Sequence, residues 1–472
     1  MSKTIILSFP DFPEDTDILI ENDAPFYIKG QFSAEINSEF FAAKLAKMYD
    51  MVFFPMDGWF EFQNGRWTSL RESDLEKRIR DLLKTEMRRN DVHSHDKISK
   101  SICPIMNSLK TICDHGETIP ALPPDVIPVK NGVLEWNESE KQFVYRPYRR
   151  DDMIFHSLNA AYDSKAQSGL FMKKIKEIIP DEADRRVVQE YLGASLFSEN
   201  RTRKFLALIG EGGCGKSLLV RLLTGIMTVA RTFDLNFSEI ADKFAFSALR
   251  TQTLLTASEA ASQAFLQRSG IEFVKRATGG DFFQSDLKYK NFRIDHHGFF
   301  SLIVVSNNKL LFQYDGKGEE FKDRLIVVQF NKHIDSDKQD KDLAEKLLQD
   351  RSAILNWLLE GAQRVREKKW NITLTPSQIS RRDRIINATK GIEIFVRNHI
   401  RFDAGNALPI QEAYQAYAKL CITVGFECMT EKTFQHRFHN AMLEILGSVP
   451  CNTIRLRNGN VVRGYKHYTI TL

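Results

Sequence analysis

The stretch that decides the fold reads K-F-L-A-L-I-G-E-G-G-C-G-K-S-L-L-V-R-L-L and covers residues 204–223. An apolar run precedes the glycine-rich segment 210–217, and a run with apolar residues on one helical face follows it. The segment 210–217 fits G-x-x-x-x-G-K-[ST], a pattern typical of loops whose backbone N–H groups surround phosphate oxygens. This order of strand, loop and helix predicts an α/β domain that binds a nucleoside triphosphate.

Each residue type in this segment suits a phosphate ligand. Glycine tolerates backbone conformations that other residues disfavour, and the segment places it at Gly210, Gly212, Gly213 and Gly215. We expect Lys216 to reach the β- and γ-phosphates and Ser217 to offer its hydroxyl to Mg²⁺. We predict ATP rather than GTP because the sequence N-K-H-I at 331–334 lacks the acid of a guanine-reading N-K-x-D segment.

Two further apolar runs end in polar residues. T-L-L-T-A-S-E (253–259) delivers Glu259, which we expect to orient or deprotonate the attacking water. Ser258 stands where a second acid is usual, so Mg²⁺ would depend on Ser217, Glu259 and water. S-L-I-V-V-S-N-N (301–308) offers Asn307 to the γ-phosphate or the water. An ordinary surface glutamate after a core strand remains the alternative for Glu259.

Cations occupy two further positions near apolar strands. In F-K-D-R-L-I-V-V-Q-F (321–330), Arg324 either makes a surface ion pair or acts as a finger that enters a neighbouring subunit's site. S-D-L-K-Y-K-N-F-R-I (285–294) predicts a hairpin whose tip carries Lys288, Tyr289 and Lys290. Lysine neutralises phosphate and tyrosine packs on sugar or base, so the tip suits DNA. A solvated charged turn is the alternative.

Composition and targeting signals narrow the class of protein. The chain has 472 residues and a net charge of +5, an excess too small to indicate nucleic-acid binding without local clusters. The sequence shows neither a secretion signal nor an apolar run long enough to span a membrane, and its six cysteines show no disulfide-framework spacing, so we expect a cytoplasmic protein. The group His93, His95, Cys103, Cys113 and His115 matches no familiar zinc spacing, and we disfavour a zinc site.

The N-terminal hundred residues predict mixed strands and helices. Two aromatic-rich strands around Asn64-Gly65 (59–70) predict a hairpin, and a helix with Ser73 as its N-cap follows. A proline-rich stretch at 119–128 marks the first boundary. We therefore predict domains at 1–120 (α+β, role unknown), 121–200 (a collar of strands and helices), 201–370 (the nucleotide-binding core) and 391–472, with a linker at 371–390.

The sequence of the C-terminal domain predicts a winged-helix fold. Helical patterns cover 392–400, 410–420 and 431–446, the last with Thr430 as N-cap, and a hairpin turns at Asn458-Gly459. The segment 455–467 is basic and contains no acid, and we expect it to contact duplex DNA with the third helix as groove reader. Its cations are Arg455, Arg457, Arg463 and Lys466. A domain that docks protein is the alternative.

This order of motifs resembles the superfamily 3 helicases of viruses, phages and plasmids, within the AAA+ class. It is most similar to the phage and poxvirus primase-helicase branch. Four other stretches support the resemblance: N-G-V-L (131–134), E-Y-L-G (190–193), T-G-G-D (278–281) and I-L-N-W-L-L-E-G (354–361). The similarity extends from about residue 125 to the C-terminus.

The resemblance implies a hexameric ring that moves 3′-to-5′ on one DNA strand. In that family a hairpin tip with a Lys followed by an aromatic residue or His projects into the ring's channel, and Lys288 and Tyr289 match these positions. The 120 residues before the proline-rich stretch are short for a primase domain, and the one D-x-D sequence among them is Asp15-Thr16-Asp17. We therefore expect a helicase without its own primase, which replicates a phage, plasmid or mobile element in the bacterial host cytosol and works with a loader or primase.

Two alternatives stay open. An origin-binding AAA+ initiator would use ATP as an assembly switch, bind duplex DNA and not displace a strand. An AAA+ protein remodeller would grip polypeptide with the hairpin, although Lys-Tyr-Lys favours phosphate over peptide.

Overall fold

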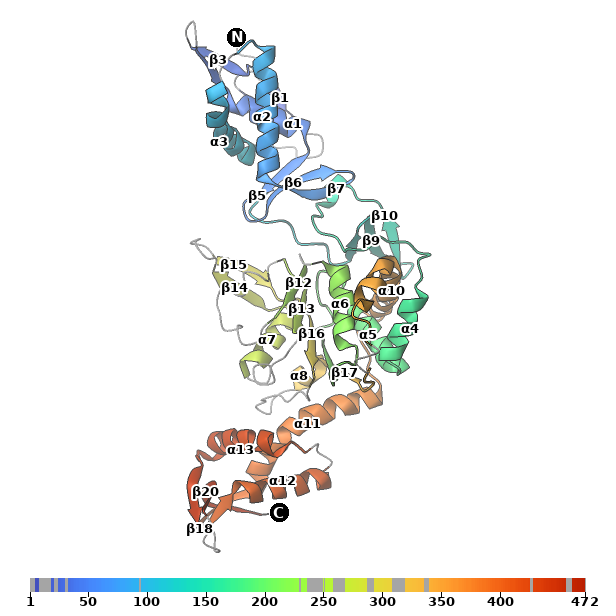
Figure 1. The fold of residues 1–472 in the computed structure, drawn as a ribbon, viewed down its shortest axis with the longest axis vertical. Coiled ribbons are helices and arrows are strands. Elements are labelled where there is room, and N and C mark those ends of the chain that lie inside the picture. The colour runs from blue at the N-terminus through green and yellow to red at the C-terminus, as the bar shows by residue number, and fades with distance from the viewer. Residues whose placement is uncertain are drawn as a thin grey trace. The chain divides into compact units, whose positions relative to one another are not determined.

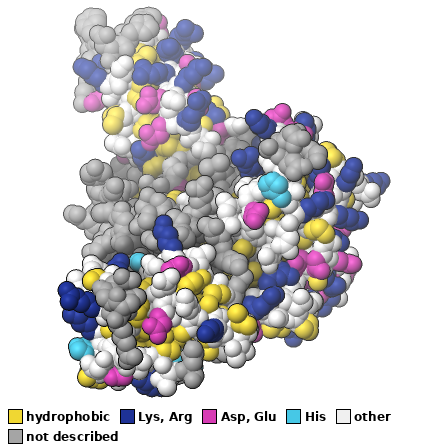
Figure 2. Space-filling view, turned by 60° about the horizontal axis from the view of Figure 1, so that its bottom comes forward, with side chains coloured by type: hydrophobic (Ala, Val, Ile, Leu, Met, Phe, Trp, Pro, Cys, Tyr) yellow, Lys and Arg dark blue, Asp and Glu magenta, His cyan; other side chains and the backbone are white. Residues whose placement is uncertain are grey.

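The computed structural model describes residues 5–7, 18–20, 24–29, 33–92, 95–228, 231–235, 249, 251–257, 268–286, 293–307, 319–334, 339–424, 428–455 and 461–471. The chain forms two compact units, one of residues 1–136 and 143–157 and the other of residues 137–142 and 158–472 (Figure 1). No helix in the described ranges is long and apolar enough to cross a bilayer. Lys and Arg are interspersed with Asp and Glu on the face that Figure 2 presents.

In its described residues, the first unit combines a small antiparallel sheet with three helices. Strands β5 (Met51–Phe54), β6 (Gly58–Gln63) and β7 (Arg66–Leu70) pair in sequence order, and short strands form two further pairs: β1 (Ile5–Leu7) with β2 (Ile18–Ile20), and β3 (Phe26–Lys29) with β4 (Ser33–Ile36). The predicted hairpin is confirmed, because Asn64 (φ 51°) and Gly65 (φ 78°) connect β6 to β7. Positive φ at both turn residues suits the twist of a two-residue hairpin.

Helices α1 (Ser38–Met48), α2 (Glu72–Arg89) and α3 (His95–Ile112) share one apolar core in this unit. The prediction of Ser73 as the N-cap of α2 was wrong, since the N-cap is Arg71 and its side chain makes no capping hydrogen bond. Glu72 and Asp74 instead place negative charge in the first turn, where the helix dipole favours it. Arg71 binds Asp74 at 2.9 Å.

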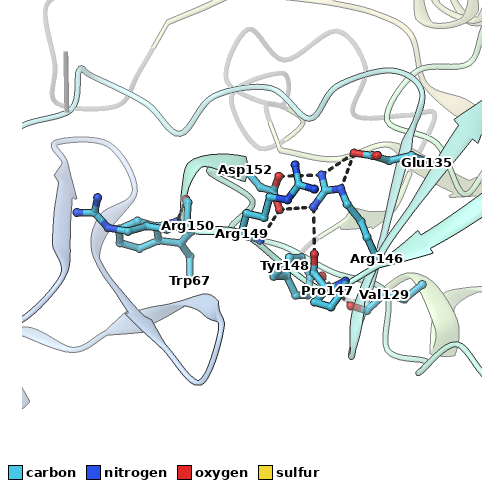
Figure 3. A network of polar contacts seen from close by, with 9 residues as sticks. All are labelled: Trp67, Val129, Glu135, Arg146, Pro147, Tyr148, Arg149, Arg150 and Asp152. Atoms are coloured by element: carbon cyan, nitrogen blue, oxygen red, sulfur yellow. Dashed lines mark hydrogen bonds and ion pairs between the residues drawn. The ribbon is translucent and has the colours of Figure 1, made fainter. Parts of the chain in front are cut away.

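A second antiparallel sheet contains β8 (Val126–Val129), β9 (Gly132–Asn137) and β10 (Gln142–Arg146). Figure 3 shows Arg146 between two acids: it contacts Asp152 through both Nη atoms, at 2.7 and 2.8 Å, and Glu135 through Nε at 2.9 Å. Hydrogen bonds to these carboxylates raise the pKa of Arg146 above its ordinary value. The indole N–H of Trp67 donates to the Arg150 carbonyl at 2.9 Å, so the network also holds β7.

The second unit contains a five-stranded parallel sheet, which confirms the predicted α/β core. Its order is β12-β13-β16-β11-β17, with β12 (Thr232–Asp234), β13 (Leu254–Ala257), β16 (Ser301–Ser306), β11 (Phe205–Gly210) and β17 (Leu325–Phe330). Figure 1 shows α7 (Arg268–Gly279) on one side of the sheet and α6 (Lys216–Met227) on the other. Alternate side chains of four strands pack with α7 in one apolar core.

Two other helices in this unit, α5 (Glu182–Ala194) and α10 (Arg351–Glu367), approach each other through glycines. A Cβ at Gly193 would lie 2.3 Å from the Ala362 nitrogen, and one at Gly361 would lie 2.0 Å from the Gln189 carbonyl oxygen. Only glycine fits such a backbone contact. Two of the sequence stretches noted above, E-Y-L-G and I-L-N-W-L-L-E-G, therefore meet in space. The remaining helices nearby are α4 (Gly169–Ile178), α8 (Glu319–Arg324) and α9 (Leu343–Leu347).

The described residues of the C-terminal part form three helices and a three-stranded antiparallel sheet. Helices α11 (Pro376–His399), α12 (Ile410–Val424) and α13 (Glu431–Leu446) share a core that includes Phe395, Tyr417 and Phe434. The strands run in the order β18 (Ile400–Pro409), β20 (Val461–Ile470) and β19 (Cys451–Arg455). Most of the predicted linker at 371–390 is helical, and the sequence prediction missed β18. Thr430 is the N-cap of α13, as predicted; Asn458-Gly459 lies outside the described residues.

Candidate functional site

The glycine-rich segment 210–217 connects the carboxyl end of β11 to the start of α6. Strand β11 lies between β16 and β17, and the chain adds β12, β13 and β16 on one side of it before β17 on the other. Parallel sheets bind ligands at their carboxyl edge, where the strand order reverses. The loop therefore occupies the place where this fold most often carries a ligand.

Backbone geometry accounts for three of the four glycines. Gly210, Gly213 and Gly215 have φ of 157°, 79° and 90°. A Cβ at Gly210 would lie 2.2 Å from the Phe330 carbonyl oxygen, and one at Gly215 would lie 2.8 Å from Cγ2 of Ile178. Gly212 has open space around it, so its own chain does not demand glycine there.

Lys216 is the first residue of α6, and its side chain folds back over the loop. Its Nζ donates to the carbonyl oxygens of Gly210 and Glu211, each at 2.7 Å. The residue is only 3% exposed, and burial lowers the pKa of its ammonium. Both acceptors are uncharged, so the ammonium lacks a counter-ion there and suits an anion. Ser217 follows it in the first turn of α6 and is exposed.

Asn307 flanks the start of the loop. In β16, Ser306 pairs with Ile209 of β11, so Asn307 comes level with Gly210 on the neighbouring strand. Asn307 is exposed. The side chain predicted to contact the γ-phosphate or the water thus follows the strand next to the loop, and its role stays a prediction.

Glu259 comes two residues after the end of β13 and lies outside the described residues, as does Ser258. The sequence prediction overlooked another acid at this edge, Asp234 at the end of β12. Its Oδ1 accepts a hydrogen bond from the hydroxyl of Thr256, at 3.0 Å. Among the described residues, no group of three or more His, Cys, Asp or Glu side chains is placed to hold a metal ion.

The segment 331–334 after β17 contacts the loop from the side opposite Asn307, and sequence reasoning missed this. The Nδ1 atom of His333 hydrogen-bonds the Gly212 carbonyl oxygen at 2.8 Å, and the backbone N–H of Ile334 donates to the Gly213 carbonyl oxygen at 3.3 Å. The sheet order could have predicted this contact. Strand β17 lies beside β11, so the residues that follow β17 leave the sheet at the same edge as the loop.

Arg324 lies at the opposite, amino edge of the sheet. It ends α8, and the next residue, Leu325, pairs with Phe205 at the start of β11. The six residues of β11 span about 17 Å, so Arg324 is remote from the loop of its own chain. Its Nη1 donates to the Lys275 carbonyl oxygen at 2.8 Å and to the Thr278 hydroxyl at 3.0 Å.

Charged residues of both signs surround Arg324. Burial lowers its pKa, and the positive charge of Arg203 lowers it further, while Glu320 and Asp281 act in the opposite direction. Arg203 precedes β11, is exposed and has φ of 55°. A second arginine that the sequence analysis did not single out therefore accompanies Arg324 at this edge.

The predicted channel hairpin is described only in its arms. Strands β14 (Phe282–Asp286) and β15 (Arg293–His297) pair antiparallel, with Asp286 opposite Arg293, which confirms two arms around the predicted tip. The tip itself, with Lys288, Tyr289 and Lys290, lies outside the described residues.

The predicted DNA-binding cations of the C-terminal part are partly described. Arg455 is exposed at the end of β19, and Arg463 and Lys466 are exposed on β20, whereas Arg457 lies outside the described residues. Arg455 lies opposite Val461, so Arg455 and Arg463 share a face of the sheet. Their contact with duplex DNA stays a prediction.

Helix α13 adjoins this sheet through His439. The hydroxyl of Tyr465 on β20 and the Nδ1 atom of His439 are 2.7 Å apart. Burial lowers the pKa of His439, and the nearby charges of Arg463 and His436 lower it further. The structure thus brings Arg463 close to α13, the helix predicted to read a groove.

Models of protein families match two parts of the chain. Residues 39–180 match the family described as D5 N terminal like, and residues 208–324 match a family of unknown function, DUF5906. No curated protein matches the sequence. Two solved structures of the NrS-1 C terminal region, an A form and another apo structure of residues 305–718, are each 11% identical with a TM-score of 0.46. They cover 88% and 91% of this chain, and 88% and 99% of their own chains.

The match over residues 39–180 agrees with the phage and plasmid primase-helicase branch that the sequence motifs resemble. Membership of superfamily 3 stays a prediction.

Proposed function

We propose that this chain is an ATP-driven DNA helicase for the replication of a phage, plasmid or other mobile element, and that it acts as a ring, most simply a hexamer. The observation that carries the proposal is the glycine-rich loop at the carboxyl edge of a parallel sheet, with the buried ammonium of Lys216 folded over it. The D5 N terminal like match to residues 39–180 supports the replication context.

The described residues of the loop fit a triphosphate, and the sequence offers Ser217 and Glu259 as ligands for Mg²⁺. Phosphate oxygens would replace the Gly210 and Glu211 carbonyls as acceptors for Lys216, exchanging neutral partners for charged ones. Ser217 and Glu259 would hold Mg²⁺, which neutralises charge on the β- and γ-phosphates when bound. Asn307 would hydrogen-bond the γ-phosphate or the attacking water, and Glu259 would orient that water.

Arg324 would act in the neighbouring subunit. It lies about 17 Å from the loop of its own chain, at the other edge of the sheet. A guanidinium at the neighbour's γ-phosphate would stabilise the charge that develops during hydrolysis. This arrangement requires that at least two copies of the chain assemble, with the amino edge of one sheet against the carboxyl edge of the next.

Two parts of the chain would contact DNA. The tip residues Lys288, Tyr289 and Lys290 would hold one strand in the channel through phosphate charge and ring stacking. The C-terminal part would act as a winged helix, with α13 in a groove of duplex DNA and basic residues of the segment 455–467 against the DNA backbone. These residues would be Arg455, Arg457, Arg463 and Lys466, of which Lys466 lies on the opposite face of β20 from Arg463.

Steady-state ATPase rates with and without single-stranded DNA test this function. We expect DNA to stimulate the wild type and Lys216→Ala to abolish hydrolysis. The double variant Lys288→Ala with Lys290→Ala should keep the basal rate and lose the stimulation. Stimulation that survives in the double variant would remove the hairpin from the mechanism and favour an initiator that uses ATP as an assembly switch.

A further inference from the structure

The segment that follows β17 holds the glycine-rich loop by two successive carbonyl groups. Strand β17 pairs with β11 as far as Gly210 and Phe330, so residues 331–334 leave the sheet beside the loop. His333 binds the Gly212 carbonyl oxygen through Nδ1, at 2.8 Å. Because a carbonyl oxygen can only accept, Nδ1 carries the hydrogen. The N–H of Ile334 binds the next carbonyl, that of Gly213.

These two contacts determine where the loop's N–H groups point. In a trans peptide unit the C=O and the N–H point in opposite directions. The unit that contains the Gly212 carbonyl also contains the N–H of Gly213, and the unit with the Gly213 carbonyl contains the N–H of Cys214. Holding both carbonyls towards residues 333–334 turns both N–H groups away from that segment. Successive N–H groups on one side of a turn form an anion-binding concavity.

Close packing against Gly213 also restricts the conformation of the loop. Gly213 has φ of 79°, and a Cβ there would lie 3.0 Å from Cε1 of His333 and 2.9 Å from Nε2 of Gln339. The same Nε2 atom donates to the Ile334 carbonyl oxygen at 2.7 Å. The imidazole and the amide thus lie directly over Gly213, and Gln339 in turn holds the segment that carries His333.

We propose that His333 is a positioning residue for the triphosphate site: it orients the peptide units of the loop so that the N–H groups of Gly213 and Cys214 face the phosphates. The proposal rests on the proposed function in one respect, that the loop binds ATP. His333 itself touches the loop's carbonyl and acts through it.

The test compares His333→Ala with His333→Asn, whose amide N–H can replace that of Nδ1. The control is His399→Ala, because His399 also uses Nδ1, at the same 2.8 Å, to bind a backbone carbonyl oxygen, that of Thr471. A fluorescent ATP analogue with Mg²⁺ gives Kd, and ATP hydrolysis gives KM and kcat. Lys216→Ala is measured alongside, and thermal unfolding reports folding.

We expect His333→Ala to raise Kd and KM about 2- to 10-fold, as for one lost hydrogen bond, with a smaller change in kcat. His333→Asn should restore most of the affinity, and His399→Ala should bind like the wild type. Wild-type affinity in His333→Ala would overturn the inference, as would a loss that Asn fails to restore. Whichever result His333→Ala gives, a loss of ATP affinity in Lys216→Ala leaves the proposed function standing. Normal ATP binding by Lys216→Ala would overturn the proposed function itself.

Discussion

The carboxyl and amino edges of the five-stranded sheet differ in how many parts of a nucleotide site a single chain supplies there. At the carboxyl edge, a single chain supplies the loop, the ammonium of Lys216 and the flanking Asn307 and His333. At the amino edge, Arg324 and Arg203 bring two positive charges together, and the described partners of Arg324 are a carbonyl and a hydroxyl. The first edge offers an anion site within the chain, whereas at the second edge the half-buried guanidinium of Arg324 lies against α7 near the exposed Arg203.

In the proposed ring, this difference would let the two edges serve one reaction in different subunits. Removing Lys216 from the carboxyl edge or Arg324 from the amino edge should therefore stop ATP hydrolysis, but for a different reason in each case. A change at the carboxyl edge should impair ATP binding, whereas a change at the amino edge should leave binding intact and impair only the chemical step.

The largest effect is expected for Arg324→Ala. An arginine that stabilises transition-state charge contributes about 10³- to 10⁵-fold in kcat, so hydrolysis should fall by about 10³-fold or more. The Kd for ATP should stay near the wild-type value, because the loop is unaltered. Nucleotide titration and steady-state kinetics measure the two quantities separately.

The control for this variant is Arg401→Ala, which removes another arginine that donates to backbone carbonyls, those of Arg397 and Ile400. It should hydrolyse ATP normally. If Arg324→Ala lost ATP binding or its folded structure as well, the side chain would serve mainly to join α7 to α8.

Much of this comparison could be predicted from the sequence, since the glycine-rich motif, the apolar strands and Arg324 are each recognisable locally. His333 could not, because its importance depends on β17 lying beside β11, which is a matter of sheet order. Strand β18 was missed for a related reason. Its sequence I-R-F-D-A-G-N-A-L-P contains Asp, Gly and Asn, which single strands disfavour, and pairing with β20 overrides that preference.

The next effect separates two adjacent glycines at the carboxyl edge. Gly213→Ala forces a side chain into φ of 79° and against His333 and Gln339, whereas Gly212→Ala meets nothing within 4 Å. Backbone strain costs about 1–3 kcal/mol, so the Kd for ATP should rise about 5- to 150-fold in Gly213→Ala. An equal rise in Kd in the two variants would indicate that contact with ATP, rather than packing within the chain, requires glycine at both positions. Calorimetric titration with both folded variants decides this.

The smallest effect concerns pH. Burial lowers the pKa of Lys216 from 10.5, and a bound triphosphate favours the charged ammonium, so binding raises that pKa and takes up a proton. The Kd for ATP should therefore be constant at lower pH and rise as pH passes through the lowered pKa, by at most about tenfold per pH unit. Lys216→Arg keeps its charge and should abolish the rise. An equal rise in both proteins would assign it to another group.

The most direct test of the central claim is the complementation of two inactive variants. Lys216→Ala and Arg324→Ala are co-expressed with different tags and purified through both, so that every assembly contains both kinds of subunit. An interface where Lys216 comes from one variant and Arg324 from the other is complete, and random mixing makes about a quarter of the interfaces in a ring complete. The account predicts that ATP hydrolysis, absent from either variant alone, returns in the mixed assemblies. Mixed assemblies that stay inactive, or a failure of the two variants to co-purify, would contradict it.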